Sequence, residues 1–363
     1  MSINDIILNV MIIFMVIGAI DKAFLNNKFG YGEQFEEGIM AMGALAMAMV
    51  GIMCLAPVIG TVLTPVVTPI FKLMGADPAM FAGSLLAIDM GGFAISQTMT
   101  TNQEVVMLSG IILGSMMGAT IVFSIPVSLG IIEKEDHPYL AKGILAGIIA
   151  IPVGCFVGGL IAGISVGTLT VNLIPVILLS VLLALGLWKI PDKVLAGFNI
   201  FAKFITILIL IGFALGIIQG LSGWKIIPGM DDIEPQLETV GLIAITLAGA
   251  YPLVHFITTV FKKPLMKLGK LIGVNEVAAA GIVATLANNI PMFGMMKDMD
   301  ERGKVIAVAF SVGAAFALGD HLGYTSANAP ELIFPMIAGK IVAGIFGIIV
   351  AQVLVLRKTP SAK

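Results

Sequence analysis

Three ionisable side chains interrupt stretches that otherwise consist of apolar residues. Asp320 and His321 lie in FALGDHLGYTSANAPE, and Asp89 lies in LLAIDMGGFAISQTM. A charge at membrane depth is costly, so such residues usually face a cavity or a partner and mark a path for a solute or an ion. The carboxylates could bind a cationic solute or a coupling ion, and the imidazole could relay protons near neutral pH.

Each of these residues also has a structural interpretation. Asp89 could cap a half-helix or accept hydrogen bonds from backbone groups that the following Gly-Gly pair leaves free. Asp320 and His321 could stand at a helix end, in contact with headgroups or water. Because Ser or Asn can cap a helix without a charge, a binding role is favoured for Asp89.

Uncharged polar residues extend the candidate binding site. Ser96 and Gln97 follow the break after Asp89 and could line the same cavity, although polar residues are also common at segment ends. Tyr251 and Tyr324 could present ring faces to an ammonium group. Tyrosine is also a frequent anchor at the membrane interface, which is the commoner role.

The composition settles the class of protein. Of the 363 residues, 58% are hydrophobic and 12% are charged, whereas soluble domains carry about 25% charged residues. No charged residue occurs from Gly143 to Trp188, a length that suffices for two spans of about 20 residues each. The chain is therefore expected to be an all-α integral membrane protein, because barrels lack long apolar runs.

The apolar runs predict about eleven transmembrane or re-entrant segments. The N-terminal run has no basic region and no small-residue cleavage site, so it is interpreted as a retained first span. The expected segments are 4–22, 38–61, 78–99, 105–132, 140–164, 170–188, 196–220, 238–261, 276–296, 304–323 and 333–356.

The two halves of the chain resemble one another. Ordered matches keep a nearly constant spacing, from 195 residues for Pro57 and Pro252 to 198 for Gly83 and Gly281, and AKGILAG at 141–147 matches AGKIVAG at 338–344. Chance similarity between Ala/Gly/Ile/Val-rich strings is the alternative. A repeat is favoured, with five-segment units at 1–168 and 195–363 joined by a linking segment at 169–194; internal repeats are typical of transporters.

The repeat brings two polar breaks into register. Asp89-Met90-Gly91-Gly92 falls opposite Ala287-Asn288-Asn289-Ile290-Pro291, and both strings are poor continuations of a helix. Interrupted segments at matching places in two halves indicate a binding site. Asn288 and Asn289 offer amide donors and acceptors suited to a hydroxyl, or they satisfy the kinked backbone.

The orientation of the repeats stays open at this stage. Lys262, Lys263, Lys267 and Lys270 favour a cytoplasmic loop after the eighth segment, and Arg357, Lys358 and Lys363 favour a cytoplasmic C-terminus. Three full spans between these two groups would place them on opposite sides. One resolution is a re-entrant segment at 276–296.

Several kinds of chemistry are disfavoured. Cys54 and Cys155 lie in apolar runs without a CxxC motif or a Cys/His cluster, so they are interpreted as packed hydrophobes, and no metal or cofactor is expected. There is no basic patch with interleaved aromatics for nucleic acid. There is also no P-loop for ATP-driven transport.

Together, MAMGALAMAMVGIMCLAPVI, LLAIDMGGFAISQTM and FALGDHLGYTSANAPE resemble the EutH family of ethanolamine-utilisation transporters. The resemblance covers essentially the whole chain. It implies uptake of ethanolamine across the bacterial cytoplasmic membrane without ATP hydrolysis, with membrane lipids as the surroundings. The chemistry agrees, because a protonated amine needs a carboxylate or an aromatic face and its hydroxyl needs a polar partner.

Three other functions stay open. The chain could be a proton- or sodium-coupled symporter of another small amine or amino acid. It could be an intramembrane enzyme that uses Asp320 and His321, although no nucleophile or metal-ligand motif accompanies them. It could also be a scaffold or signalling partner. Glycine-rich faces such as Gly110/Gly114/Gly118 allow a homo-oligomer without requiring one.

Overall fold

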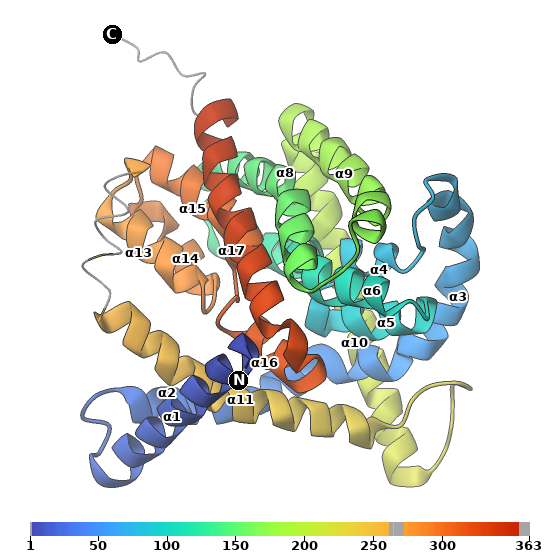
Figure 1. The fold of residues 1–363 in the computed structure, drawn as a ribbon, viewed down its shortest axis with the longest axis horizontal. Helices are drawn as coiled ribbons and strands as arrows, with labels where there is room; N and C mark the ends of the chain where they lie inside the picture. Colours follow the sequence, from blue (N-terminus) through green and yellow to red (C-terminus); the bar gives the residue numbers. More distant parts are fainter. Residues whose placement is uncertain (1, 261–263, 265–271, 356–363) are drawn as a thin grey trace.

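The computed structural model describes residues 2–260, 264 and 272–355 of the chain (Figure 1). These residues form helices and no strand, and eight of the helices are long and apolar enough to cross a membrane. The prediction of an all-α membrane protein is confirmed. The basic residues used above to judge sidedness, from Lys262 to Lys270 and from Arg357 to Lys363, lie outside the described residues.

The eight long helices correspond to eight of the eleven expected segments. Some of them are composite, because π-helical or 3₁₀-helical stretches (both labelled η) continue an α-helix without a break. They are α1 (Ile3–Phe24); α2 (Tyr31–Leu45), η1 (Ala46–Val50) and α3 (Gly51–Leu73); α6 (Gln103–Val106), η3 (Met107–Gly118), η4 (Thr120–Ser124) and α7 (Ile125–Ile131); η5 (Lys134–Asp136) and α8 (His137–Ile161); α9 (Val166–Lys189); α10 (Pro191–Ser222); α11 (Ile233–Val260); and η7 (Pro330–Leu332), α17 (Ile333–Val350) and η8 (Ala351–Val355).

The other three expected segments are interrupted. The first consists of α4 (Met80–Leu85), η2 (Ile88–Gly92) and α5 (Phe93–Met99), and the second of α13 (Glu276–Thr285), α14 (Ile290–Gly294) and η6 (Met296–Asp298). The third was expected as one apolar segment at 304–323. Instead α15 (Glu301–Ala314) ends early, and a turn at 315–319 leads into α16 (Asp320–Asn328).

Two of the interrupted segments fold back on themselves. Thr100 Oγ1 donates a hydrogen bond to Asp77 Oδ2 over 2.7 Å, which joins the two ends of the first segment. Asn275 Nδ2 donates to the carbonyl oxygen of Asp298 over 3.0 Å, which joins the ends of the second. Ends that meet cannot lie on opposite sides of a hydrocarbon core about 30 Å thick. Both segments therefore have the geometry of re-entrant hairpins.

The two hairpins start from opposite faces of the molecule. Glu104 accepts a hydrogen bond from Ser165, so the first hairpin lies at the face where α8 ends and α9 begins. Lys304 pairs with Asp136 at 2.5 Å, so the second lies at the face where α8 begins. We call these the Glu104 face and the Lys304 face. They are separated by α8, whose 25 residues span about 37 Å.

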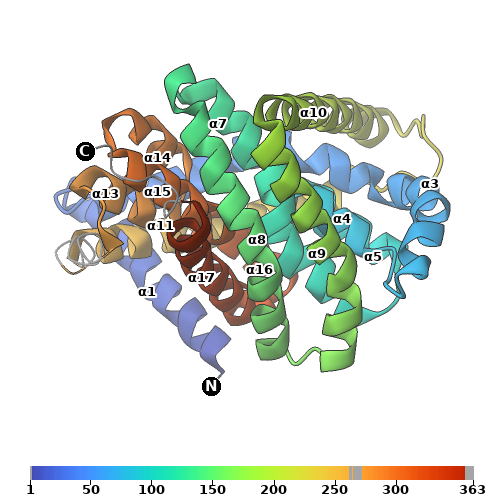
Figure 2. The same cartoon turned by 90° about the horizontal axis from the view of Figure 1, so that it is seen from above.

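The remaining long helices alternate between these faces. α9 runs from the Glu104 face to the Lys304 face and α10 returns, so Ser222 and the following loop lie at the Glu104 face. α17 packs antiparallel to α8, since Gly154 faces Ala343 whereas Gly158 faces Pro335. Figure 2 shows α8 beside α9, and Figure 1 shows α17 crossing α8.

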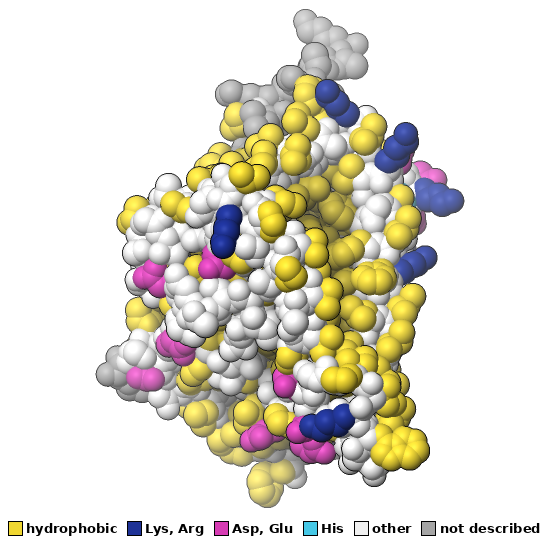
Figure 3. All heavy atoms as spheres, turned by 90° about the vertical axis from the view of Figure 1, so that its right-hand side faces the viewer, with side chains coloured by type: hydrophobic (Ala, Val, Ile, Leu, Met, Phe, Trp, Pro, Cys, Tyr) yellow, Lys and Arg dark blue, Asp and Glu magenta, His cyan; other side chains and the backbone are white. Residues whose placement is uncertain are grey.

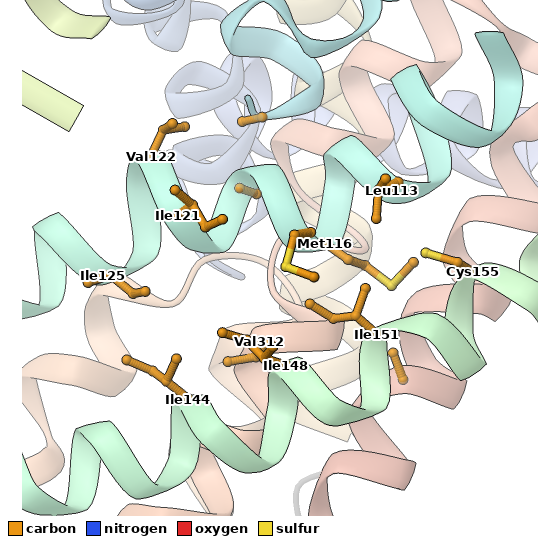
Figure 4. Close-up of a cluster of buried hydrophobic side chains, with 14 of the residues drawn as sticks. Leu113, Met116, Ile121, Val122, Ile125, Ile144, Ile148, Ile151, Cys155 and Val312 are labelled. Atoms are coloured by element: carbon orange, nitrogen blue, oxygen red, sulfur yellow. The ribbon is translucent and has the colours of Figure 1, made fainter. Parts of the chain in front are cut away.

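Close packing holds this arrangement together. An ideal Cβ on Gly154 would lie 2.5 Å from the carbonyl oxygen of Gly339, so any larger residue would separate α8 from α17. Next to this contact, buried side chains of η3, η4 and α8 interdigitate, including Met116, Ile148 and Ile151 (Figure 4). Many large apolar side chains are exposed, as expected in lipid, and Figure 3 shows apolar side chains over much of one face.

Candidate functional site

A pocket lies where the interrupted segments cross near the centre of the helix bundle. Its empty volume is about 260 Å³. It contains both carboxylates and the imidazole that interrupt the apolar runs of the sequence, which are brought together from two halves of the chain. We call it the central pocket; its lining residues are Ala87, Asp89, Met90, Ala119, Phe123, Phe316, Asp320 and His321.

A glycine turn places Asp89 at this pocket. The backbone N–H groups of Met90 and Gly92 both donate to the carbonyl oxygen of Ala87, at 3.0 and 2.8 Å. Gly91 has a φ of 98°, and a Cβ there would lie 2.9 Å from Ile52 Cδ1. Only glycine adopts this conformation without strain. The turn leaves the Asp89 side chain half-buried and facing the pocket.

The interruption after α13 and the turn at 315–319 cross each other, and together they position Asp320 and His321. The N–H of Phe316 donates to the carbonyl oxygen of Thr285 over 3.0 Å, and that of Leu318 donates to Leu286 over 2.8 Å. These bonds satisfy backbone groups that the ends of α13 and α15 leave free. Phe316 has a φ of 62°, a left-handed conformation that is unusual for a residue with a side chain. Such strain is often found at functional sites.

The charged groups of the pocket have different partners. Tyr251 Oη donates to Asp320 Oδ1 over 3.0 Å. Lys340 of α17 donates from Nζ to the carbonyl oxygen of Ser115, and the same Nζ lies 3.1 Å from His321 Nδ1. Asp89 lines the same pocket as Asp320 and His321. The pocket therefore joins two half-buried carboxylates to a buried histidine that contacts a buried lysine.

Aromatic rings complete the wall of the pocket. Phe123 and Phe316 stack edge to face, with centroids 5.5 Å apart, and the Phe316 ring lies 5.1 Å from that of His321. Aromatic faces beside carboxylates attract organic ammonium groups, because the ring quadrupole favours a cation. The central pocket thus has the chemistry of a site for a small organic cation.

A second, larger pocket lies on the Glu104 side of the central pocket. Its empty volume is about 630 Å³. The half-helix α16 contributes to the walls of both pockets, and α5, which lines the second, directly follows η2, which lines the central pocket. We call it the vestibule; its lining residues are Met53, Ala56, Phe93, Ala94, Gln97, Thr98, Asp231, Pro235, Gln236, Thr239, Tyr324 and Asn328.

Of the binding residues predicted from the sequence, Asp89, Asp320 and His321 line the central pocket, whereas Gln97 and Tyr324 line the vestibule. The other three line neither pocket and form hydrogen bonds within the protein. Ser96 donates to the carbonyl oxygen of Gly92 over 2.7 Å. Asn288 accepts from the N–H of Ile290, and Asn289 donates to Ser124 Oγ, both over 2.8 Å.

The sequence reasoning missed Lys340, Phe123 and Phe316. Lys340 had a visible signal, because it is a lone charge in the apolar run 333–356. The two phenylalanines had none, since phenylalanine is abundant in membrane helices and only the crossing of the segments brings these two into contact.

A multi-pass helical protein with interrupted segments around a buried charged pocket has the architecture of a secondary transporter. The chain belongs to the family described as ethanolamine utilisation protein, EutH, whose model matches residues 3–354. It is therefore a multi-pass bacterial membrane protein.

Three relatives are each named probable ethanolamine permease EutH. The protein of Listeria monocytogenes is 60% identical over 96% of this chain and 94% of its own length. The Salmonella typhimurium protein is 52% identical over 98% and 96%, and the Escherichia coli protein is 50% identical over 100% and 98%. No solved structure matches the chain.

Proposed function

We propose that this protein takes up protonated ethanolamine by facilitated diffusion, with the central pocket as the substrate site. The observation that carries the proposal is that Asp89 and Asp320, from the two halves of the chain, line one pocket together with aromatic rings. The names of the relatives support the same substrate.

The two ends of ethanolamine would have different partners in this pocket. The ammonium group would lie between the carboxylates and over the ring faces of Phe123 and Phe316. The hydroxyl would reach His321, whose Nδ1 is occupied by Lys340 at 3.1 Å, so Nε2 is the ring nitrogen available to substrate. Asn288 and Asn289 would support the second break rather than contact the substrate.

The vestibule is proposed as the route to the central pocket from the Glu104 face. Tyr324, at the wall between the two, is 1% exposed and stacks edge to face on Phe93 with centroids 6.1 Å apart. Substrate reaching the central pocket from this side must displace that contact. In alternating access, movement of α5 and α16 would open one pocket while the other face closes.

The proposed two related units have inverted orientations. The short helices η5 and η7 begin 196 residues apart, at Lys134 and Pro330, and each leads directly into a long helix. The re-entrant hairpins lie at positions that correspond in the two halves but start from opposite faces. This correspondence between the two halves supports a first unit at 1–168, a linking segment at 169–194 and a second unit at 195–363.

Charge supports a cytoplasmic location for the Lys304 face. Basic residues concentrate on the cytoplasmic side of membrane proteins. Both α11 and α17 end at the Lys304 face, so the two basic groups that follow them in the sequence no longer conflict. Described basic residues near the Lys304 face are Lys22, Lys28, Lys134, Lys142, Lys189, Lys193, Lys297, Arg302 and Lys304, whereas Lys72 and Lys225 lie near the Glu104 face.

The test is uptake of labelled ethanolamine into proteoliposomes at acidic pH, where diffusion of the neutral amine is least. Asp89→Asn and Asp320→Asn should each reduce kcat/KM at least about tenfold, because a half-buried charge partner of the ammonium is lost. Glu135→Gln, at an exposed position near the Lys304 face, is the control. Wild-type rates in both aspartate variants would refute the assignment. Uptake that requires an imposed proton or sodium gradient would favour the symporter.

A further inference from the structure

Lys340 is the most unusual charged residue of the central region. Its side chain is 1% exposed, and its Nζ contacts one carbonyl oxygen and one imidazole nitrogen. Among the residues that the structure describes, no carboxylate forms an ion pair with it. A buried ammonium without a paired carboxylate is costly, so the position calls for an explanation beyond packing.

The surroundings of Lys340 allow a simple count of charge. When Lys340 is protonated, its Nζ donates to His321 Nδ1 over 3.1 Å, and a His321 ring that accepts at this nitrogen carries no charge. Asp89 and Asp320 each carry one negative charge when ionised, and Lys340 carries one positive charge. Glu37, on α2, is exposed and does not line the central pocket. The cluster then has one net negative charge.

We propose that Lys340 is a fixed counter-charge that limits the central pocket to a single monovalent cation. One alkylammonium ion neutralises the cluster, whereas a diammonium ion would leave one uncompensated positive charge away from water, which is strongly unfavourable. Without Lys340, the two carboxylates would instead match a dication. This inference rests on the proposed function and identifies Lys340 as a specificity-determining residue.

The bond to Ser115 does not account for a lysine at this position. Ser115 lies in the π-helical stretch η3, where its carbonyl oxygen accepts from Lys340 Nζ. A neutral donor such as glutamine could make the same hydrogen bond at a smaller desolvation cost. A positive charge is required only if it balances other charges, and Lys340 contacts His321, which lines the central pocket together with Asp89 and Asp320.

The test measures binding of ethanolamine and of putrescine, which is doubly charged at neutral pH, to the purified protein by calorimetry. Four proteins are compared: wild type, Lys340→Met, Asp89→Asn and the double variant. Lys340→Met should weaken ethanolamine binding relative to putrescine by at least about thirtyfold, since a buried charge balance is broken. Asp89→Asn should weaken binding of both amines.

The double variant separates charge balance from structure. Asp320 alone again gives one net negative charge, so ethanolamine binding should recover at least about tenfold over either single variant. If Lys340 were only structural, the double variant would bind ethanolamine more weakly than Lys340→Met does. The preference of Lys340→Met for ethanolamine over putrescine would also equal that of the wild type. Either result would overturn the inference. If the wild type bound and transported no ethanolamine, the proposed function itself would fail.

Discussion

Tyr251 Oη donates a hydrogen bond to Asp320 Oδ1 over 3.0 Å, and this contact ties the middle of α11 to the first residue of α16. The bond orients one of the two carboxylates of the central pocket, and no described residue donates a hydrogen bond to its second oxygen, which can therefore bind a cation. A residue of a long, continuous helix thus positions the end of an interrupted one.

Removal of this hydroxyl should weaken substrate binding. A hydrogen bond to a charged group contributes about 1.5 to 3 kcal/mol, so Tyr251→Phe should raise KM for ethanolamine about tenfold or more. The control is Tyr31→Phe, because Tyr31 lies outside both pockets. Uptake kinetics in proteoliposomes measure the effect, and equal KM values for the two variants would show that the bond has no role in binding.

The turn that carries Asp89 should not tolerate a side chain. Gly91→Ala places a Cβ at a φ of 98° and 2.9 Å from Ile52 Cδ1. The left-handed conformation alone costs about 1 to 2 kcal/mol. We expect a lower thermal unfolding midpoint and lost uptake. Gly43→Ala, whose Cβ would have open space in a helix, should be neutral or stabilising; a similar midpoint for both would contradict the strained turn.

Asp231 should assist the approach of substrate through the vestibule. Asp231→Asn should raise KM about fivefold, as expected for loss of about 1 kcal/mol between charges near water. The matched control is Asp232→Asn, because Asp232 interacts with Lys225 at 3.5 Å and does not line the vestibule. An equal effect of both variants would point to general surface charge instead.

The effect of Asp231 should also depend on pH. Partial burial and the neighbouring Asp232 carboxylate raise the pKa of Asp231 above its ordinary value. Asp231 therefore loses its charge at a higher pH than an exposed aspartate does. As the pH falls through this pKa, wild type and Asp231→Asn should converge in KM; a difference that grows in acid would contradict the assignment.

Asn289 should be a structural residue. It is fully buried and donates to Ser124 Oγ over 2.8 Å, which joins the second hairpin to η4. Asn289→Ala should cost about 1 to 3 kcal/mol of stability and change KM much less than Tyr251→Phe does. Ser124→Ala should show non-additive stability with it in a double-mutant cycle. A large rise in KM without destabilisation would return Asn289 to the binding site.

The proposed sidedness can be checked by cysteine labelling. Cys54 and Cys155 are buried, so they should react little with a membrane-impermeant maleimide. Ser222→Cys at the Glu104 face should be labelled in intact cells, and Lys193→Cys at the Lys304 face only after permeabilisation. Labelling of Lys193→Cys in intact cells, and of Ser222→Cys only after permeabilisation, would show that the Lys304 face is not cytoplasmic.

Several residues of the central pocket could be predicted from the sequence, because a charged side chain within an apolar segment is energetically unfavourable. That argument selected Asp89, Asp320 and His321, and it applied equally to Lys340, which was overlooked. Asn288 and Asn289 were selected from the matching breaks, yet a break can either bind substrate or satisfy its own backbone. Sequence cannot separate these roles, because they differ only in where the side chain points.

The sequence by itself determined that this chain is a helical membrane protein with costly charges at interrupted segments, since composition and local pattern decide whether a segment can enter lipid. Only the tertiary structure decided which charges meet. The approach of Asp89 to Asp320 depends on a glycine turn, two crossed backbone breaks and hairpins from opposite faces. These are contacts between residues far apart in the chain, and local sequence does not specify them.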